Sequence, residues 1–214
     1  MKVLTIASGK GGTGKTIIAA TLAARLAARS PKERVAMIDL NADQASLTQW
    51  WIARGRGVSP YLVQEVSNLV STVRALKKDG YAWCVIDCPP TDTHINDFGI
   101  LVADLVIVPV RLAFLDTNAT ESIVETAAQR RKRFAFLVNA YDARPAFKKS
   151  NTEGLGMLGS WPMFEIRLPY SAKFIEGQSA GKTPAELDKS IAEKIDALID
   201  EIETMLSTKG KVNV

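Results

Sequence analysis

Short apolar runs alternate with longer mixed segments along this chain. Most of these runs are unbroken stretches of Val, Ile and Leu type, which is typical of strands buried on both faces. Helices are predicted between them, among them Ser67–Lys78 and Asp116–Arg131, with Ser67 and Asp116 as N-caps. This rhythm predicts an α/β fold: a doubly wound, mostly parallel sheet flanked by helices and joined by right-handed crossovers. The predicted strands are Lys2–Ala7, Arg34–Leu40, Tyr61–Val66, Ala82–Asp87, Leu105–Val110, Phe134–Asn139 and Met163–Ile166.

A last amphipathic helix is predicted over about Ala185–Leu206. Its polar face is acidic up to the short tail that carries Lys209 and Lys211, whereas a helix that lies on anionic lipid has a basic polar face. We therefore expect this helix to dock on the sheet, and we expect no membrane partner. Its apolar face at helical spacing comprises Ile191, Ile195, Leu198, Ile199, Ile202, Met205 and Leu206.

The length of 214 residues predicts a single domain over residues 1–206, followed by a short flexible tail over residues 207–214. A net charge of +4 permits binding to nucleic acid or to an acidic membrane but proves neither. Cys84 and Cys88 are unsuited to a structural disulfide, and the start of the chain runs straight into a strand without a signal peptide. We therefore expect a cytoplasmic protein.

The segment Ser8–Thr16, SGKGGTGKT, connects the first predicted strand to an Ala-rich helix. It matches the phosphate-binding pattern G-x-x-x-x-G-K-[ST], with Gly9 and Gly14 as the fixed glycines. Glycines let backbone N–H groups turn toward phosphates, and the helix that follows directs the positive end of its dipole at them. Lys15 is the predicted cation for the β- and γ-phosphates, and the Thr16 hydroxyl a predicted Mg²⁺ ligand.

Asp87 ends the fourth predicted strand after four apolar residues, which is the ending of a Walker B motif. Its carboxylate is well placed to hold Mg²⁺, directly or through water.

The loop Lys10–Thr16, KGGTGKT, resembles the deviant Walker A box KGGxGK[ST] of the ParA/MinD family. The resemblance implies an ATP-dependent homodimer in which Lys10 crosses the interface to the partner's nucleotide. The family box usually continues with Thr, where this chain has Ile17. The Cys-Pro-Pro that follows Asp87 is similar to the D-x-P-P segment of the family.

The run that begins at Asp39 resembles the family's switch I segment D-x-D-P-Q, but it is one residue longer and lacks the proline. Asp39 aligns with the first family Asp and is a predicted metal ligand. The second, catalytic acid is Asp43 or Asn41; we choose Asp43 because only a carboxylate accepts a proton from water. The alternative for Asp43 is a solvated loop acid.

The family resemblance also assigns the adenine side of the site. An Asn or Arg at the end of the sixth strand borders the base, which corresponds to Asn139, and a second loop corresponds to Arg167–Tyr170. The predicted catalytic residues are Lys10, Lys15 and Asp43, and the predicted metal ligands are Thr16, Asp39 and Asp87. The predicted ATP-binding residues are Gly9, Lys10, Gly11, Gly12, Thr13, Gly14, Lys15, Thr16, Ile17, Asn139, Leu168 and Pro169.

The resemblance is to the small ParA type and implies an ATPase switch with ATP and Mg²⁺ as cofactors. The ATP-bound dimer would bind DNA without sequence preference and lie on the nucleoid, and a ParB-like or adaptor protein would stimulate a weak hydrolysis. Its cargo could be a plasmid, a chromosome region or a protein cluster. Candidate DNA contacts are Arg130, Arg131, Arg133 and Lys173. The alternative is that such cations lie in solvent at the end of a helix, where the helix dipole favours positive charge.

Two other functions are open at this point. A MinD-like, membrane-associated spatial regulator would need a basic lipid-binding helix. A reductase similar to the nitrogenase iron protein would need cysteines on the dimer axis for an iron–sulfur cluster.

Overall fold

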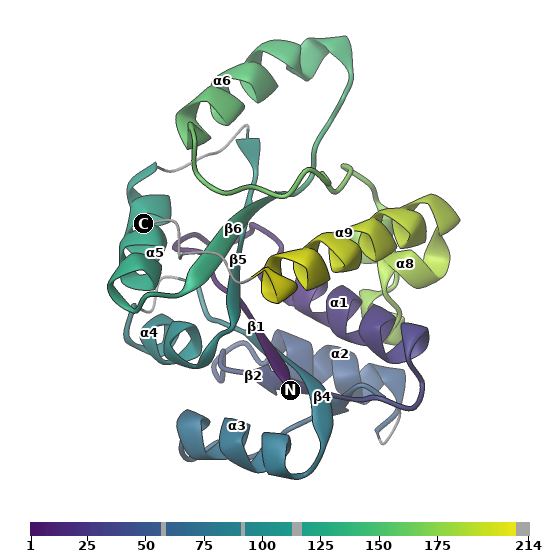
Figure 1. Cartoon of the computed structure of the whole chain (residues 1–214). Helices are drawn as coiled ribbons and strands as arrows, with labels where there is room; N and C mark the ends of the chain where they lie inside the picture. Colours follow the sequence, from purple (N-terminus) through teal and green to yellow (C-terminus); the bar gives the residue numbers. More distant parts are fainter. Residues whose placement is uncertain (57–58, 91–92, 113–116, 209–214) are drawn as a thin grey trace.

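A six-stranded, all-parallel sheet forms the centre of the molecule, in the order β3-β2-β4-β1-β5-β6 (Figure 1). The computed structural model describes residues 1–56, 59–90, 93–112 and 117–208. The doubly wound α/β fold is thereby confirmed. The strands are β1 (Lys2–Ile6), β2 (Arg34–Asp39), β3 (Tyr61–Leu62), β4 (Tyr81–Asp87), β5 (Leu105–Val110) and β6 (Arg133–Val138).

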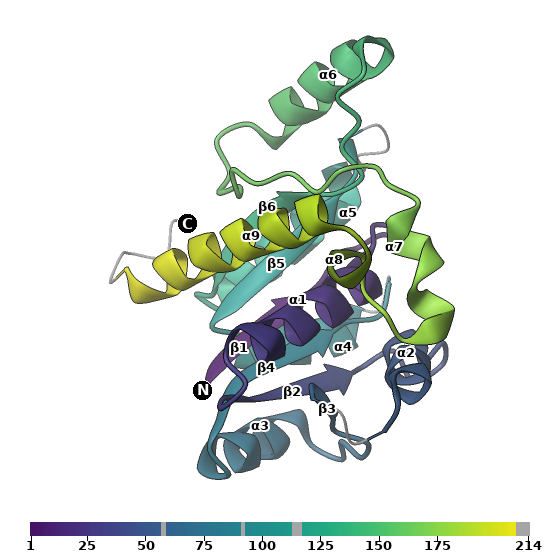
Figure 2. The same cartoon turned by 90° about the vertical axis from the view of Figure 1, so that its right-hand side faces the viewer.

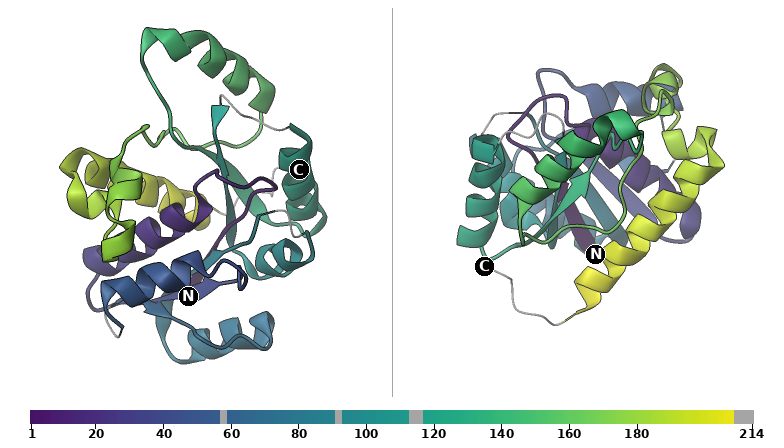
Figure 3. Two further views of the ribbon diagram at one scale, coloured as in Figure 1. Left: turned by 180° about the vertical axis from the view of Figure 1, so that it is seen from behind. Right: turned by 90° about the horizontal axis from the view of Figure 1, so that it is seen from above.

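Helices cover both faces of the sheet, and each face has its own apolar cluster (Figures 2 and 3). One face carries α1 (Lys15–Arg29), α2 (Ser46–Arg54), α8 (Pro184–Leu187) and α9 (Lys189–Ser207). The other carries α3 (Leu69–Lys78), α4 (Thr93–Val102) and α5 (Thr117–Gln129). Helix α6 (Lys148–Leu158) lies beyond the β6 edge, and α7 (Lys173–Glu176) leads back toward α8.

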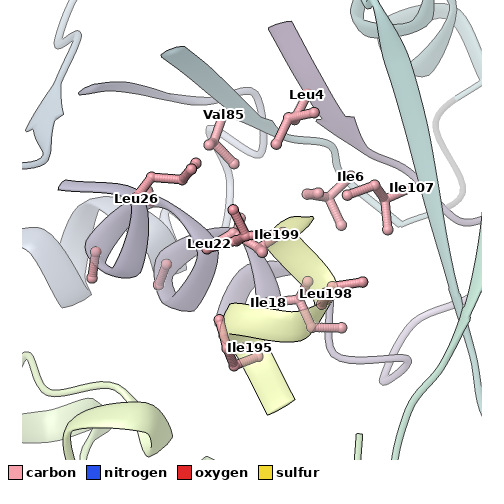
Figure 4. Packing of buried hydrophobic residues seen from close by; sticks show 14 of the residues in the cluster. Leu4, Ile6, Ile18, Leu22, Leu26, Val85, Ile107, Ile195, Leu198 and Ile199 are labelled. Atoms are coloured by element: carbon pink, nitrogen blue, oxygen red, sulfur yellow. The ribbon is translucent and has the colours of Figure 1, made fainter. Parts of the chain in front are cut away.

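The last helix was expected to dock on the sheet; it packs into the apolar cluster of one sheet face, beside α1. Leu198 and Ile199 of α9 meet Ile18 and Leu22 of α1 in the core (Figure 4). The alanines of α1 are small enough for the two helices to lie close together. The acidic face of α9 is engaged as well, because Asp196 accepts two hydrogen bonds from Arg25 of α1 at 2.7 and 2.5 Å.

The predicted strand Met163–Ile166 is wrong, because Met163 alone of this segment forms a bridge, an isolated one to Phe136 of β6. Phe164 N–H donates to the Phe136 carbonyl at 3.0 Å, but the next two amides do not continue the ladder. The amides of Glu165 and Ile166 instead donate to the two carboxylate oxygens of Glu201 on α9, at 2.9 and 3.1 Å. Every second amide of a parallel strand faces its neighbour, so the Ile166 amide is the one that Glu201 diverts from β6.

Several element boundaries differ from the prediction. Asn68, not Ser67, caps α3 by accepting from the Ser71 amide, so the helix begins two residues later. The predicted single helix over Ala185–Leu206 is broken at Asp188, whose extended backbone ends α8 and whose carboxylate caps α9. Strand β3, at the sheet edge, is only two residues long, because its pairing with β2 is confined to Tyr61 and Leu62. Asp116 and residues 209–214 lie outside the described part of the chain.

Candidate functional site

The glycine loop leaves the end of β1, in the centre of the sheet, and enters α1. Two of its glycines need the left-handed region, Gly12 with φ of +76° and Gly14 with φ of +96°. A Cβ on Gly14 would lie 2.3 Å from Asn139 Nδ2, so only glycine fits there. Gly11 and Gly12 are exposed, which leaves the outer side of the loop accessible to a phosphate chain.

Lys15 is folded inward at the start of α1. Its ammonium is held by the Ser8 hydroxyl at 3.2 Å and by the Lys10 carbonyl at 3.1 Å. Burial lowers the pKa of Lys15, against the opposing charge of Asp87. Ser8 also contacts the Thr13 hydroxyl at 2.8 Å and donates to the Lys10 carbonyl at 3.0 Å. A buried cation whose two hydrogen-bond acceptors are neutral oxygens fits a site for phosphate.

Asp87 lies beside this cation at the carboxyl end of β4. It is only 1% exposed, and within the described residues its Oδ1 has no hydrogen-bond partner. Burial raises the pKa of Asp87 to about 7; the Thr16 hydroxyl and Lys15 act in the opposite direction, and the charge of Asp39 adds to the rise. An unpartnered buried carboxylate oxygen beside a hydroxyl is the donor set that Mg²⁺ accepts.

Asp39 ends β2 in register with Asp87 on the neighbouring strand β4. Its Oδ2 accepts from both the amide and the hydroxyl of Thr48, each at 2.9 Å, and its Oδ1 from the Asn41 amide at 3.0 Å. Asp39 therefore joins the end of β2 to the first turn of α2. The three predicted metal ligands Thr16, Asp39 and Asp87 all lie at this edge of the sheet. The described residues hold no cluster of three or more His, Cys, Asp or Glu, so Mg²⁺ would depend on phosphate oxygens for its remaining ligands.

The two candidates for the second switch acid differ in their surroundings. Asn41 is 8% exposed and donates its amide group to Gln44 Oε1 at 3.1 Å. Asp43 is exposed in the turn between β2 and α2. Its role as the acid that meets the attacking water stays a prediction, and its position leaves it accessible to water.

The adenine-side residues are not equivalent. Asn139 braces the phosphate loop, because its Nδ2 donates to the Thr13 carbonyl at 2.8 Å. Leu168 has a fully buried side chain, its amide donates to Val138, and its carbonyl accepts from Tyr141, so it could only shape the site. Pro169 lines a surface cavity of about 820 Å³. The base contact of Asn139 stays a prediction, whereas its contact with the loop was not anticipated.

The predicted DNA-contacting residues do not form one surface group. Arg130 is exposed and pairs with Asp97 of α4 at 3.1 Å, and Arg131 is exposed just after α5. Lys173 pairs with Glu176 at 2.7 Å. Arg133 is partly buried and donates to the Met205 and Leu206 carbonyls of α9, at 2.5 and 3.3 Å, so its guanidinium serves the end of that helix.

Two residues of the site were missed by sequence reasoning. Ser8 holds Lys15, and its position directly before Gly9 was the available signal. Thr48 holds Asp39 from nine residues away, and no pattern in the sequence marks it.

The iron–sulfur reductase and the membrane regulator would each need a feature that can be compared with the structure. Cys84 and Cys88 are buried free thiols, so neither is presented at a surface where two subunits could share a cluster. The apolar face of α9 packs on the core instead of facing outward. Among the described residues, no helix combines the length and apolarity needed to cross a bilayer.

Comparisons with known proteins relate the chain to a nucleotide-binding family. A family model described as the CobQ/CobB/MinD/ParA nucleotide binding domain matches residues 4–185. The maintenance of carboxysome distribution protein A of Halothiobacillus neapolitanus is 26% identical over 211 residues, which cover 93% of this chain and 95% of that protein. The protein of the same name from Gloeobacter kilaueensis is 37% identical over 118 residues, so the match spans 54% of this chain and about half of that protein, 51%.

The fold also resembles solved structures. The septum site-determining protein MinD of Pyrococcus horikoshii, complexed with Mg-ADP, superposes with a TM-score of 0.74 at 17% identity, covering 99% of both chains.

Proposed function

The chain belongs to the CobQ/CobB/MinD/ParA nucleotide-binding family, and from this premise we propose that it is an ATP-dependent switch of the ParA type. ATP and Mg²⁺ are its cofactors. In the proposed cycle, ATP drives two copies together, the dimer binds DNA without sequence preference, and hydrolysis to ADP and phosphate separates the copies. The observation that carries the proposal is the KGGTGKT loop, in which Lys10 is exposed while Lys15 is buried.

In this proposal, Lys15 and Lys10 contact the phosphates of two different nucleotides. Lys15 and the loop amides bind the phosphates of the subunit's own nucleotide. Lys10 reaches the nucleotide of the second subunit, where its charge stabilises negative charge that develops on the phosphates. Thr16, Asp39 and Asp87 hold Mg²⁺, which neutralises phosphate charge when it is bound. Asp43 orients the attacking water and accepts its proton.

We further propose that the cargo is a protein assembly and that an adaptor protein on it stimulates a weak hydrolysis. The supporting observation is the similarity, along nearly the whole chain, to a protein named for carboxysome distribution. Similarity to the chromosome-partitioning ATPase Soj of Thermus thermophilus, 24% identical over 218 residues, keeps a DNA cargo as the second candidate. In either case the proposed location is the cytoplasm, on the nucleoid in the ATP state.

A MinD-like membrane regulator is less well supported. Helix α9 presents no apolar face to a lipid surface, because its residues Leu198, Ile199 and Ile202 are buried in the core. Sedimentation with anionic vesicles in the presence of ATP tests this alternative, and we expect the protein to remain in the supernatant.

Lys10→Ala and Asp43→Ala test the switch. Lys10→Ala should still bind ATP, because Lys15 and the loop are intact, but should neither dimerise nor hydrolyse. Asp43→Ala should bind ATP and accumulate as a dimer, because it cannot turn over. Light scattering after size exclusion with ATP and Mg²⁺ measures the dimer, and phosphate release measures hydrolysis.

Lys32→Ala is the matched control, since Lys32 is an exposed lysine in the turn after α1. It should behave like the parent protein. A Lys10→Ala protein that dimerises and hydrolyses as well as Lys32→Ala would refute the role of Lys10 across the interface.

DNA binding has its own test. The ATP-loaded protein should bind unrelated duplexes equally and lose affinity steeply as salt rises. Arg130→Ala combined with Arg131→Ala should weaken binding, whereas Arg133 is unsuitable because it holds the end of α9. A strong preference for one sequence, or no binding at low salt, would contradict the proposal.

A further inference from the structure

A cavity lies at the β3 edge of the sheet, and Asp39 of the nucleotide site forms part of its wall. Its volume is about 650 Å³, within the range of small-molecule sites. Helices α2 and α4 and the start of α3 supply its walls, which are mostly apolar. They include Trp51, Ile52, Leu69, Val70, Phe98 and Leu101.

Part of this apolar surface faces water. Phe98 of α4 is 58% exposed and Ile52 of α2 is 44% exposed, although both are large hydrophobic residues at the rim of the same cavity. An apolar ligand would remove these side chains from water, which favours binding.

The charged side chains in the wall of the cavity indicate which charge a ligand would carry. Among the residues that the structure describes, the charged lining residues are Asp39 and Arg56. Arg56 is exposed, so a pair with it would be screened by solvent. Asp39 is partly buried, and its Oδ1 accepts one hydrogen bond and its Oδ2 two. A carboxylate has about four acceptor sites, which leaves room for one more donor.

We propose that this cavity is a regulatory site for a small apolar amine. The hydrocarbon or aromatic body lies between α2, α3 and α4, and the ammonium group donates to Asp39. Asp39 is also bonded to Thr48 at the start of α2, so the ligand touches the link between the cavity and the nucleotide site.

Occupancy of the cavity should therefore oppose the Mg²⁺–nucleotide state. An ammonium group and Mg²⁺ would compete for the same carboxylate, and linkage requires each to weaken the other by the same factor. This coupling rests on the metal role of Asp39 in the proposed function. Binding of the amine to the ligand-free protein does not.

The test uses 2-(1-naphthyl)ethylamine and its neutral analogue 2-(1-naphthyl)ethanol, titrated calorimetrically into the protein with EDTA and without nucleotide. We expect saturable binding at one site, with the amine bound about tenfold more tightly than the alcohol because its hydrogen bond is charge-assisted. Chemical-shift changes in heteronuclear NMR spectra should be centred on the lining residues.

Three variants locate the site. Val70→Trp, which adds bulk to the wall from α3, should weaken both probes about tenfold or more, and a thermal melt checks that it folds. Phe98→Ala should weaken both probes severalfold. Ile175→Ala is the matched control, because Ile175 is 76% exposed on α7 and does not line the cavity, and it should change nothing.

Each other outcome overturns a defined part of the proposal. Absence of saturable binding, or equal binding by the parent and Val70→Trp, would eliminate the site. Equal affinities of amine and alcohol would eliminate the contact with Asp39. If Mg-ADP binds and the affinity of the amine is unchanged, the coupling is wrong; if Mg-ADP itself fails to bind, the proposed function fails while the titrations without nucleotide still decide the cavity.

Discussion

Replacing Asp87 by Asn should make the ligand-free protein more stable at neutral pH, although it removes a predicted metal ligand. Burial raises the pKa of Asp87 to about 7 from an ordinary value of 3.8. The unfolded chain loses this proton near pH 4, whereas the folded protein keeps it until about pH 7. Between these values the folded state binds more protons than the unfolded state, so its stability falls as the pH rises.

The gap between the two pKa values corresponds to about 4 kcal/mol in total, at about 1.4 kcal/mol for each pH unit. About 2 to 3 kcal/mol of this falls between pH 5 and pH 8, since part of the loss has already occurred below pH 5. Asn cannot ionise, so Asp87→Asn should gain this amount relative to the parent over that interval.

Urea unfolding in EDTA without nucleotide, at pH 5, 6, 7 and 8, measures the difference. Asp79→Asn is the control, because Asp79 is exposed at the end of α3 and its variant should follow the parent. With saturating Mg²⁺ and ADP the order should reverse, because the ion binds the ionised carboxylate of the parent and stabilises its folded state. If the free energies of unfolding of the parent and of Asp87→Asn change in parallel from pH 5 to pH 8, the raised pKa of a buried, unpaired Asp87 is refuted.

Further predictions follow from the same geometry. Gly14→Ala should cost about 1 to 3 kcal/mol of stability, because of its positive φ and the contact with Asn139, and should weaken ADP binding in calorimetry. Lys15→Ala should abolish detectable ATP binding, since the buried cation facing the phosphates is lost; unchanged affinity would contradict the phosphate site. Leu198→Ala should cost about 2 to 5 kcal/mol in urea unfolding without changing nucleotide affinity, because it opens a cavity between α1 and α9.

The central features of the site were predictable because they are local. The strand, the glycine loop and the helix that contain Lys15 and Thr16 are contiguous in the chain, and their composition determines their conformation. Asp39 and Asp87 could be placed as well, because each follows an apolar strand and parallel strands end at one edge of the sheet. The sequence therefore determined the fold class, the phosphate loop and the two acids beside it.

The features that the sequence did not predict depend on hydrogen-bond partners that are distant in the chain. The amides of Glu165 and Ile166 donate to Glu201, 36 and 35 residues away, and the Ile166 amide is thereby lost to a ladder with β6. Arg133 is occupied by the carbonyls at the end of α9, and Asn139 by the Thr13 carbonyl, although each looked available from its own neighbourhood in the sequence.

The sequence by itself determined which segments are strands and helices wherever an apolar run or a glycine loop set the local conformation. Only the tertiary structure decided which polar groups remain open for a ligand. A hydrogen bond depends on distance and direction, and packing brings together partners such as Asp39 and Thr48, or Asn139 and Thr13, that local pattern does not pair. Asp87 Oδ1, among the described residues, is left without a partner for the same reason: the folded core excludes water from it and supplies no donor.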